Sequence, residues 1–369
     1  PAVAYLVKYY DADAGVMISA SHNSVEYNGI KLFSDSGFKL PDELEEEIED
    51  IILGVEETAA EPPTGGGIGR ITYSTEAVKR YIDHIKSTAN ASFEGLNIAI
   101  DCANGSSAVS AEKLFVDLGA TVHMLSNHPN GVNINKDCGS THMERLQKYV
   151  LDNKLDCGLA YDGDADRFLA VDEKGNIIDG DMIMAICALD MKKKNKLTQN
   201  TVVGTIMTNF GFTKFCAENG ISFIATKVGD RFVLEEMNLC GYTLGGEQSG
   251  HVILSKYATT GDGILTAIKV MEAVISEKLP LSKLTEPVKM LPQVMKNVRV
   301  SDKRAVRENE KVNEVARGVE KKLSGIGRLL LRESGTEPLV RVMVEAPTRE
   351  LCESCVDEVV EAIYQEGLA

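Results

Sequence analysis

Short apolar runs alternate with loops and helical patterns along most of the chain, and this alternation constrains its fold more than any other feature. Such runs span residues 15–19, 97–101 and 201–205, and each precedes a loop. Helical patterns follow, for example over residues 110–119. Strand, loop and helix in succession predict α/β layers around a mainly parallel sheet, whose functional loops lie at the carboxyl ends of strands.

Three segments without periodicity divide the chain into four parts. The clearest is Pro/Gly-rich and spans residues 61–69, and softer breaks lie near 172–176 and 279–292. Since 369 residues are too many for a single core, we predict several domains. Their predicted bounds are 1–68, 69–174, 175–288 and 289–369. The first part is short and opens directly on an apolar segment, so we expect upstream residues to be missing.

The last part has a different pattern. It predicts a strand, a helix, two strands and a second helix, over residues 294–300, 304–323, 328–332, 340–346 and 349–365. This order suggests a small antiparallel α+β domain. Cys352 and Cys355 fall within the second helix, where core packing explains them better than a redox or metal-binding role.

The composition excludes several classes of function. The chain is 44% hydrophobic and 25% charged, and its net charge is −16. Without a basic surplus to replace counterions, we expect no nucleic-acid partner and no binding to an anionic membrane. No apolar run is long enough to span a bilayer, and the eight cysteines are scattered, so we predict a reducing, cytoplasmic location.

Three carboxylates on alternate residues, Asp162, Asp164 and Asp166, lie between two short apolar runs. Oxygen ligands this close together suit a hard divalent cation such as Mg²⁺, and a cation there could offset charge during phosphoryl transfer. The spacing with Glu173 also resembles a calcium-binding helix-loop-helix. That pattern requires Gly where this chain has Arg167, and the flanks read as strands, so we favour the magnesium loop.

Other loops carry polar groups that suit a phosphosugar. Ser21 beside His22 follows an apolar run and could be a nucleophilic or phosphorylated serine, or an ordinary turn. Glu247 and Ser249 alternate in a glycine-rich segment and could grip neighbouring sugar hydroxyls. Residues 332–341 combine hydroxyls, glycine and two arginines, and we favour a phosphate cradle over a surface turn. Residues 227–231 and the long loop 133–142 read as solvated loops when each is taken alone.

Taken together and in order, these loops resemble those of the α-D-phosphohexomutases. The likeness covers essentially the whole chain, in the segments 19–23, 162–167, 246–251 and 332–338. It implies three related mixed-sheet α/β domains, the first N-terminally incomplete, and a C-terminal α+β domain of the TATA-binding-protein-like type, arranged around a central cleft. Two departures stand out: Ser24 takes the place of the family's usual Pro, and nothing matches the family's upstream Arg.

The resemblance also implies an activity, and the glycine-rich and arginine-rich motifs are most like the branch of the family that acts on glucosamine phosphates. The expected reaction interconverts glucosamine 6-phosphate and glucosamine 1-phosphate through a phosphoserine and a bisphosphorylated sugar, in the supply of amino sugars for cell-wall precursors. Members of the same family with the same chemistry act instead on mannose or glucose phosphates. A truncated, inactive phosphosugar-binding chain and a phosphatase with an aspartate nucleophile are also compatible with these motifs.

The family's functional residues are carried over to the matching positions. The expected catalytic residues are Ser21, His22, Lys31 and His251. One Mg²⁺ per active site would be held by a phosphoserine oxygen of Ser21 together with Asp162, Asp164 and Asp166. Substrate-binding residues would be Arg167, Lys227, Asp230, Arg231, Glu247, Ser249, Arg332, Ser334, Gly335, Thr336 and Arg341. The expected partners are the phosphosugar substrate, a sugar bisphosphate as intermediate and activator, and a second copy in a homodimer.

Overall fold

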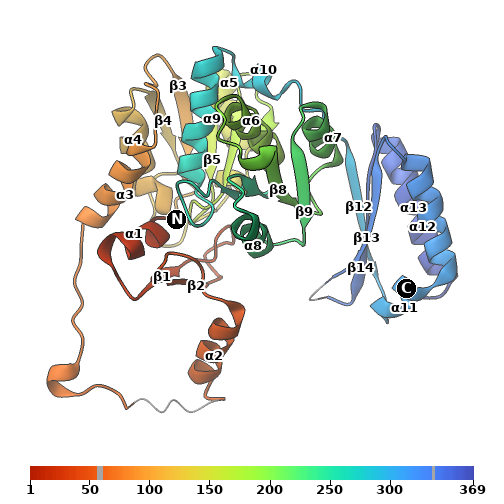
Figure 1. Cartoon of the computed structure of the whole chain (residues 1–369), viewed down its shortest axis with the longest axis horizontal. Coiled ribbons are helices and arrows are strands. Elements are labelled where there is room, and N and C mark those ends of the chain that lie inside the picture. Colours follow the sequence, from red (N-terminus) through yellow and green to blue (C-terminus); the bar gives the residue numbers. More distant parts are fainter. Residues whose placement is uncertain (56–60, 335–336) are drawn as a thin grey trace. The chain divides into compact units, whose positions relative to one another are not determined.

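A computed structural model describes residues 1–55, 61–334 and 337–369. The chain forms two compact units. The first comprises Pro1–Met207 with Gly220–Pro287, and the second comprises Thr208–Asn219 with Val288–Ala369. Figure 1 shows the elements of both units. Within the described ranges, no helix has the length and apolar character needed to cross a membrane.

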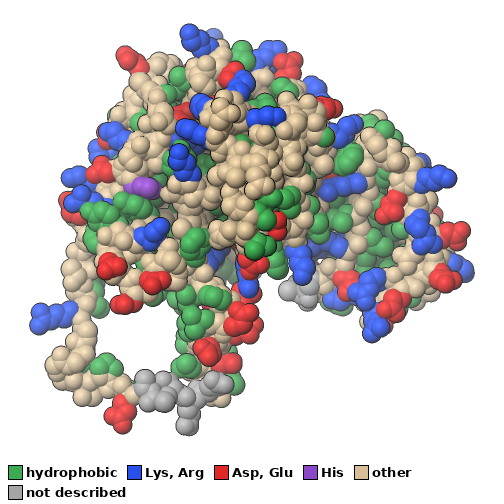
Figure 2. Space-filling model, in the orientation of Figure 1, with side chains coloured by type: hydrophobic (Ala, Val, Ile, Leu, Met, Phe, Trp, Pro, Cys, Tyr) green, Lys and Arg blue, Asp and Glu red, His purple; other side chains and the backbone are tan. Residues whose placement is uncertain are grey.

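The first unit begins with a helix packed on a two-stranded antiparallel hairpin. Its elements are α1 (Ala2–Tyr10), β1 (Ala14–Ile18), β2 (Ile30–Ser34) and α2 (Asp42–Leu53). Ala4 and Val7 of α1 pack against Phe33 of β2. The segment between the strands, residues 19–29, is closed at its base by a hydrogen bond from the Ser19 N–H to the Gly29 carbonyl, 2.9 Å. We call this segment the serine loop. Acidic side chains gather over α2 (Figure 2).

A five-stranded mixed sheet follows. Its elements are α3 (Glu76–Ser87), β3 (Asn97–Asp101), α4 (Ala111–Asp117), β4 (Thr121–Leu125), α5 (Glu144–Asn153), β5 (Cys157–Tyr161), β6 (Phe168–Asp172) and β7 (Ile177–Ile178). The strand order is β4-β3-β5-β6-β7, parallel across the first three and antiparallel across the last two. All five residues of β5 are buried, because helices pack against it, α5 and α9 among them. Residues 172–176 form the hairpin turn between the paired strands β6 and β7, and a domain boundary at 174 stays a prediction.

The rest of the first unit contains a four-stranded sheet. Its elements are α6 (Gly180–Lys193), β8 (Thr201–Thr205), β9 (Ser222–Thr226), α8 (Asp230–Cys240), β10 (Gly245–Gly246), β11 (Val252–Ile253), α9 (Gly263–Glu277) and α10 (Leu281–Thr285). The order is β11-β10-β8-β9, with β8 parallel to both of its neighbours. Gly245 and Gly246 are therefore part of an interior strand of the sheet, and the loop with Glu247 connects β10 to the edge strand β11.

The second unit is a small α+β layer. Its elements are α7 (Phe210–Glu218), β12 (Gln293–Arg299), α11 (Lys303–Glu308), α12 (Glu310–Leu323), β13 (Arg328–Glu333), β14 (Leu339–Glu345) and α13 (Arg349–Gln365). The antiparallel order is β12-β14-β13, and α12 and α13 cover the sheet. A single helix over 304–323 is wrong: the chain breaks at Asn309, whose side chain caps α12 by accepting from the Val312 N–H. Cys352 and Cys355 are free thiols inside this core, which confirms their packing role.

Candidate active site

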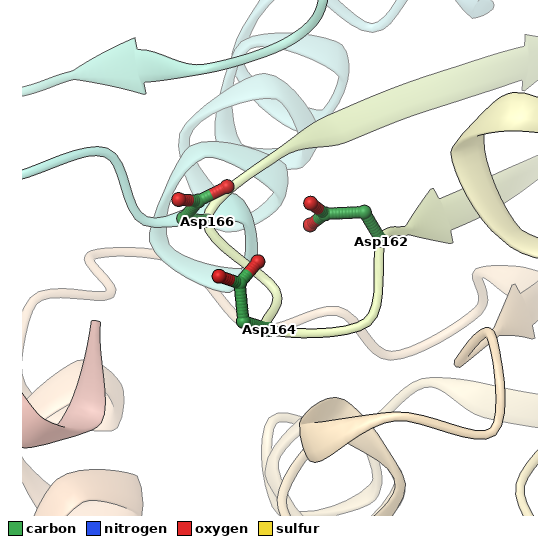
Figure 3. A group of neighbouring side chains, drawn as sticks. All are labelled: Asp162, Asp164 and Asp166. Atoms are coloured by element: carbon green, nitrogen blue, oxygen red, sulfur yellow. The ribbon is translucent and has the colours of Figure 1, made fainter. Parts of the chain in front are cut away.

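The three aspartates lie on the tight connection between β5 and β6. Asp162 directly follows β5, and its side chain accepts a hydrogen bond from the Arg167 N–H at 3.1 Å, which closes the turn. The carboxylates of Asp162, Asp164 and Asp166 point into one common space (Figure 3). All three are buried, and one oxygen of each lies within 4.8 Å of the others. Because strands and not helices flank this loop, the calcium helix-loop-helix alternative is excluded.

This donor set fits a divalent cation. Asp164 Oδ1 and Asp166 Oδ1 are buried, and neither has a hydrogen-bond partner within the described structure. An unpartnered carboxylate oxygen in the interior is costly, and a bound cation removes that cost. One oxygen of each carboxylate lies within 4.8 Å of the others, so a single cation could be held by all three. The chemistry of the donors, all oxygen, therefore supports a hard cation.

Lys31 provides a positive charge at this cluster. It projects from β2 and forms ion pairs with Asp164 Oδ2 and, at 3.0 Å, with Asp166 Oδ2. Burial alone would favour the neutral amine, but the two carboxylates outweigh it and raise the pKa of Lys31. For Asp166, burial is likewise outweighed, and His251 and Lys31 hold its pKa well below the usual range. Burial and the two neighbouring carboxylates raise the pKa of Asp162 to about 7.

Ser21 lies directly beside the triad. Its hydroxyl donates to Asp162 Oδ2 at 2.8 Å, although 141 residues separate the two in the sequence. The backbone of Ser21 is left-handed, with φ of 55°, and its N–H donates to Ser19 Oγ at 3.0 Å. This bend turns the hydroxyl out of the strand direction and toward the carboxylates. The expectation that Ser21 stands with the metal ligands is therefore consistent with the geometry.

The loop at 133–142, which read as solvated, contacts the serine loop. Asn135 is only 6% exposed, and its amide donates to the carbonyls of Ser21 at 2.8 Å and Asn23 at 2.7 Å. Sequence reasoning missed this residue, although the polar character of its loop was the available signal. A cavity of about 390 Å³ lies over the two loops, lined by the serine loop, residues 104–106 and residues 129–134.

His22 and Arg167 meet on the exposed side of the site. Arg167 Nη1 lies 2.9 Å from His22 Nδ1, so the guanidinium donates to the imidazole. Partial burial and this guanidinium lower the pKa of His22, which keeps the ring neutral. With Nδ1 accepting from Arg167, the neutral ring carries its proton on Nε2, so it can donate to a neighbouring oxygen and can accept a proton only when the Arg167 contact opens.

His251 links the metal loop to the start of α8. Its Nδ1 lies 3.6 Å from Asp166 Oδ2, and its Nε2 lies 3.5 Å from Asp230 Oδ2. Burial opposes protonation, yet Asp166 and Asp230 outweigh it and raise the pKa of this imidazole. Lys39 forms an ion pair with Asp230 and was not predicted from sequence, because nothing in its neighbourhood distinguishes it from a solvated lysine. His251 is 3% exposed, so direct access to substrate requires movement.

The remaining sugar-site candidates surround the N-terminus of α8. Glu247 Oε1 accepts a hydrogen bond from the Gly229 N–H at 3.0 Å, which joins the two loops. Ser249 is exposed on the same loop as Glu247. Lys227 is exposed, with its ammonium 5.5 Å from the centre of the Phe232 ring. Arg231 is held differently, by ion pairs with Asp42 and with Glu235. The structure therefore brings these loops together, and their roles toward a sugar stay predictions.

The expected phosphate cradle is in the second unit. Arg332 and Arg341 lie directly opposite each other on β13 and β14. Arg341 Nε is buried with no hydrogen-bond partner within the described residues, and burial together with Arg341 lowers the pKa of Arg332. Ser334 follows at the strand end and is buried. The other two expected cradle residues, Gly335 and Thr336, lie outside the described residues.

The second unit pairs two arginines across neighbouring strands, and Arg341 has a buried unpartnered Nε while its Nη2 lies 3.6 Å from Glu337. The first unit presents a serine hydroxyl on a buried carboxylate triad. Four family models of phosphoglucomutase/phosphomannomutase match the chain in order: α/β/α domain I over residues 1–59, domain II over 79–175, domain III over 179–290, and the C-terminal domain over 295–362. The chain belongs to the phosphoglucomutase/phosphomannomutase family.

Individual proteins of the family that resemble this chain include phosphoglucosamine mutases. Over 366 residues the chain is 51% identical to proteins named phosphoglucosamine mutase from Bacillus cereus (strain AH187) and Bacillus anthracis (strain CDC 684 / NRRL 3495), covering 99% of this chain and 82% of each relative. Its fold resembles that of a phosphoglucomutase/phosphomannomutase family protein from Burkholderia thailandensis, with a TM-score of 0.77 at 20% identity over 99% of this chain and 82% of that one. N-acetylphosphoglucosamine mutase from Aspergillus fumigatus, solved with GlcNAc-6P and magnesium, gives a TM-score of 0.74 at 19% identity, covering 99% and 92%.

Proposed function

We propose that this chain is a phosphosugar mutase that interconverts glucosamine 6-phosphate and glucosamine 1-phosphate. The observation that carries the proposal is the 2.8 Å contact between the Ser21 hydroxyl and Asp162 of the buried carboxylate triad. This contact supports the proposal because a serine hydroxyl beside three buried carboxylates could carry a phosphoryl group next to a bound cation. The relatives at 51% identity, named phosphoglucosamine mutase, support glucosamine phosphate as the sugar.

In the proposed reaction, phosphorylated Ser21 gives its phosphoryl group to the free hydroxyl of the sugar phosphate. The resulting bisphosphate turns end for end, and its other phosphate returns to Ser21. Mg²⁺ held by the three aspartates would offset the negative charge of the phosphoryl group. Lys31 contributes a positive charge at the same place, and His22 would take or return the proton of the reacting hydroxyl at Nδ1 once Arg167 releases that nitrogen.

Arg332 and Arg341 would hold the phosphate that is not reacting, with Ser334, Gly335 and Thr336. Two planar guanidinium groups bind a phosphate through several hydrogen bonds, which fixes its orientation. Glu247 and Ser249 would bind the sugar hydroxyls, and Arg167, Lys227, Asp230 and Arg231 would complete the substrate contacts. These assignments, one Mg²⁺ per site, activation by a sugar bisphosphate and the four domain boundaries are part of the proposal.

A coupled assay with glucosamine, mannose and glucose phosphates tests the sugar, with mass spectrometry of the purified protein alongside. We expect phosphate on Ser21 and the highest kcat/KM with glucosamine 6-phosphate. A higher kcat/KM with mannose or glucose phosphate would assign the chain to that substrate. Phosphate on an aspartate of the 162–166 loop, with none on Ser21, would indicate a phosphatase of the aspartate-nucleophile type. Homodimerisation and a cytoplasmic location stay predictions, to be tested by light scattering and by fractionation.

A further inference from the structure

Asn135 makes two hydrogen bonds to the serine loop from a different part of the chain. Its Nδ2 is 2.8 Å from the Ser21 carbonyl and 2.7 Å from the Asn23 carbonyl. Both donors of the side-chain amide are therefore used on the backbone on either side of His22. The backbone N–H of Asn135 donates to the Ala103 carbonyl at 2.9 Å. Ala103 lies two residues after β3, so this bond anchors the backbone of Asn135 next to the five-stranded sheet.

Besides the Asn135 bonds, the serine loop is held by the Ser21–Asp162 and Arg167–His22 contacts and by turn hydrogen bonds of its own backbone, such as Asn23 N–H to the Ala20 carbonyl. Residues 22–28 are all exposed, so apolar burial contributes little to its conformation. A loop of this kind adopts several conformations unless polar contacts select one. The two Asn135 bonds fix the carbonyls on both sides of His22, and with them the left-handed bend at Ser21 that aims its hydroxyl at Asp162.

Gly163 shows how closely the three loops meet. A β-carbon on Gly163 would lie 2.5 Å from the Ser21 carbonyl oxygen and 2.9 Å from Asn135 Nδ2. The serine loop, the loop with the three aspartates (residues 162–166) and the loop at 133–142 thus meet at Gly163, where a side chain would not fit. A shift of Asn135 would therefore change the distance between the Ser21 hydroxyl and the carboxylate triad.

We propose that Asn135 is a positioning residue for phosphoryl transfer, which sets the Ser21 hydroxyl against the aspartate triad. The inference rests on the proposed function of Ser21 as the phosphoryl carrier. An amide is required because both partners are carbonyl oxygens, which only a donor can satisfy. Aspartate has the same shape, but it has no donor when ionised and would place a negative charge against both carbonyls. Asn135 acts on the rate of transfer and not on the affinity for sugar.

Two variants test the hydrogen bonds donated by the side-chain amide of Asn135. Asn135 has φ of 57°, a conformation that glycine adopts without strain, so Asn135→Gly removes the side chain and keeps the backbone. Asn135→Asp keeps the size and removes both donors. Val150→Ala is the control: Val150 is fully buried against the same sheet, away from the serine loop, and its truncation lowers Tm through loss of packing.

The measurement is single-turnover transfer from Ser21, phosphorylated with glucose 1,6-bisphosphate, to glucosamine 6-phosphate. We expect Asn135→Gly and Asn135→Asp to slow transfer by about 10- to 100-fold, since an error of about 1 Å in a reacting group has effects of this size. The Kd of glucosamine 6-phosphate, measured by titration in a Ser21→Ala background, should stay within about twofold. Val150→Ala should transfer at the wild-type rate despite a lower Tm.

The inference is overturned if Asn135→Gly transfers at the wild-type rate, if Kd rises in proportion to the loss of rate, or if Val150→Ala is slowed equally. Failure of the proposed function looks different. A wild-type protein that neither accepts phosphate on Ser21 nor passes it to the sugar overturns the mutase assignment, and the role of Asn135 with it, before any variant is compared.

Discussion

The Ser21 hydroxyl donates a hydrogen bond of 2.8 Å to Asp162, across 141 residues of sequence. One partner lies on a loop between two antiparallel strands, and the other directly follows β5, a central strand of the five-stranded sheet. In the proposed function, this contact sets the phosphoryl carrier beside the cation site. The three carboxylates and Lys31 lie around the same point, so the contact brings the Ser21 hydroxyl to a site of the kind that phosphoryl transfer requires.

Ser21→Ala should abolish mutase turnover and leave the fold intact. The substitution removes the only atom of Ser21 that can carry a phosphoryl group. Loss of a small side chain from a largely exposed loop costs little stability, so Tm should change by no more than about 2 °C. The control is Ser24→Ala in the same loop, which should retain wild-type kcat. Near-normal turnover by Ser21→Ala, measured in the coupled assay, would exclude Ser21 as the carrier.

Mg²⁺ should stabilise the protein through the aspartate triad. At a concentration of 100 times Kd, a ligand bound only by the folded state adds about 2.7 kcal/mol to the free energy of unfolding. We expect Mg²⁺ to raise the Tm of the wild type and to have little effect on Asp164→Asn, which lacks one of the three charges. Differential scanning calorimetry with and without EDTA measures both.

Glu173→Gln is the matched control for the cation. Glu173 would be a ligand in a calcium helix-loop-helix, but here its carboxylate accepts hydrogen bonds from Ser282, including the N–H at 3.2 Å. Magnesium affinity should therefore be unchanged in Glu173→Gln. Loss of cation binding in this variant would contradict the assignment of ligands to Asp162, Asp164 and Asp166.

Magnesium affinity should rise with pH and level off above about pH 7. In the metal-free protein, burial and the neighbouring carboxylates raise the pKa of Asp162 to about 7, so its proton stabilises the fold at low pH and this contribution is lost as pH rises through 7. A cation requires the ionised form and competes with that proton. Below pH 7, affinity should fall by up to about tenfold per pH unit, the limit for displacement of one proton. Titration calorimetry at pH 6, 7 and 8 checks this, and a constant Kd would contradict it.

Arg332→Gln should raise stability and reduce activity. Arg332 and Arg341 face each other across β13 and β14, and like charges directly opposite destabilise a sheet by about 0.2 to 1 kcal/mol. Removing one guanidinium relieves this repulsion, but a phosphate loses one of two partners. We expect kcat/KM for glucosamine 6-phosphate to fall by about 10- to 100-fold, equivalent to about 1.4 to 2.7 kcal/mol.

Arg304→Gln provides the control for the arginine pair, because Arg304 is an exposed residue of α11 that pairs with Glu308 one turn away. It should leave kcat/KM unchanged. A destabilised Arg332→Gln protein with normal kinetics would show that the two arginines serve the fold and not the substrate.

The local pattern of apolar and polar residues was sufficient to predict several helices and strands. The strands at 97–101 and 201–205 and the helix at 349–365 match their predicted residues, because periodicity and flanking turn residues specify them. The break at Asn309 was missed because the apolar periodicity continues through it, while the cap bond to Val312 is visible only in three dimensions. The hairpin of β1 and β2 was also missed, since a loop of eleven residues between strands carries no hairpin signal.

The sequence by itself determined the family, the aspartate triad and the serine beside a strand, because each is a run of neighbouring residues whose chemistry is readable without a fold. Only the tertiary structure decided that Ser21 meets Asp162, that Lys31 lies between Asp164 and Asp166, and that Asn135 holds the serine loop. These contacts join residues more than 100 positions apart, and their partners are selected by how strands and loops pack. No local pattern contains that information.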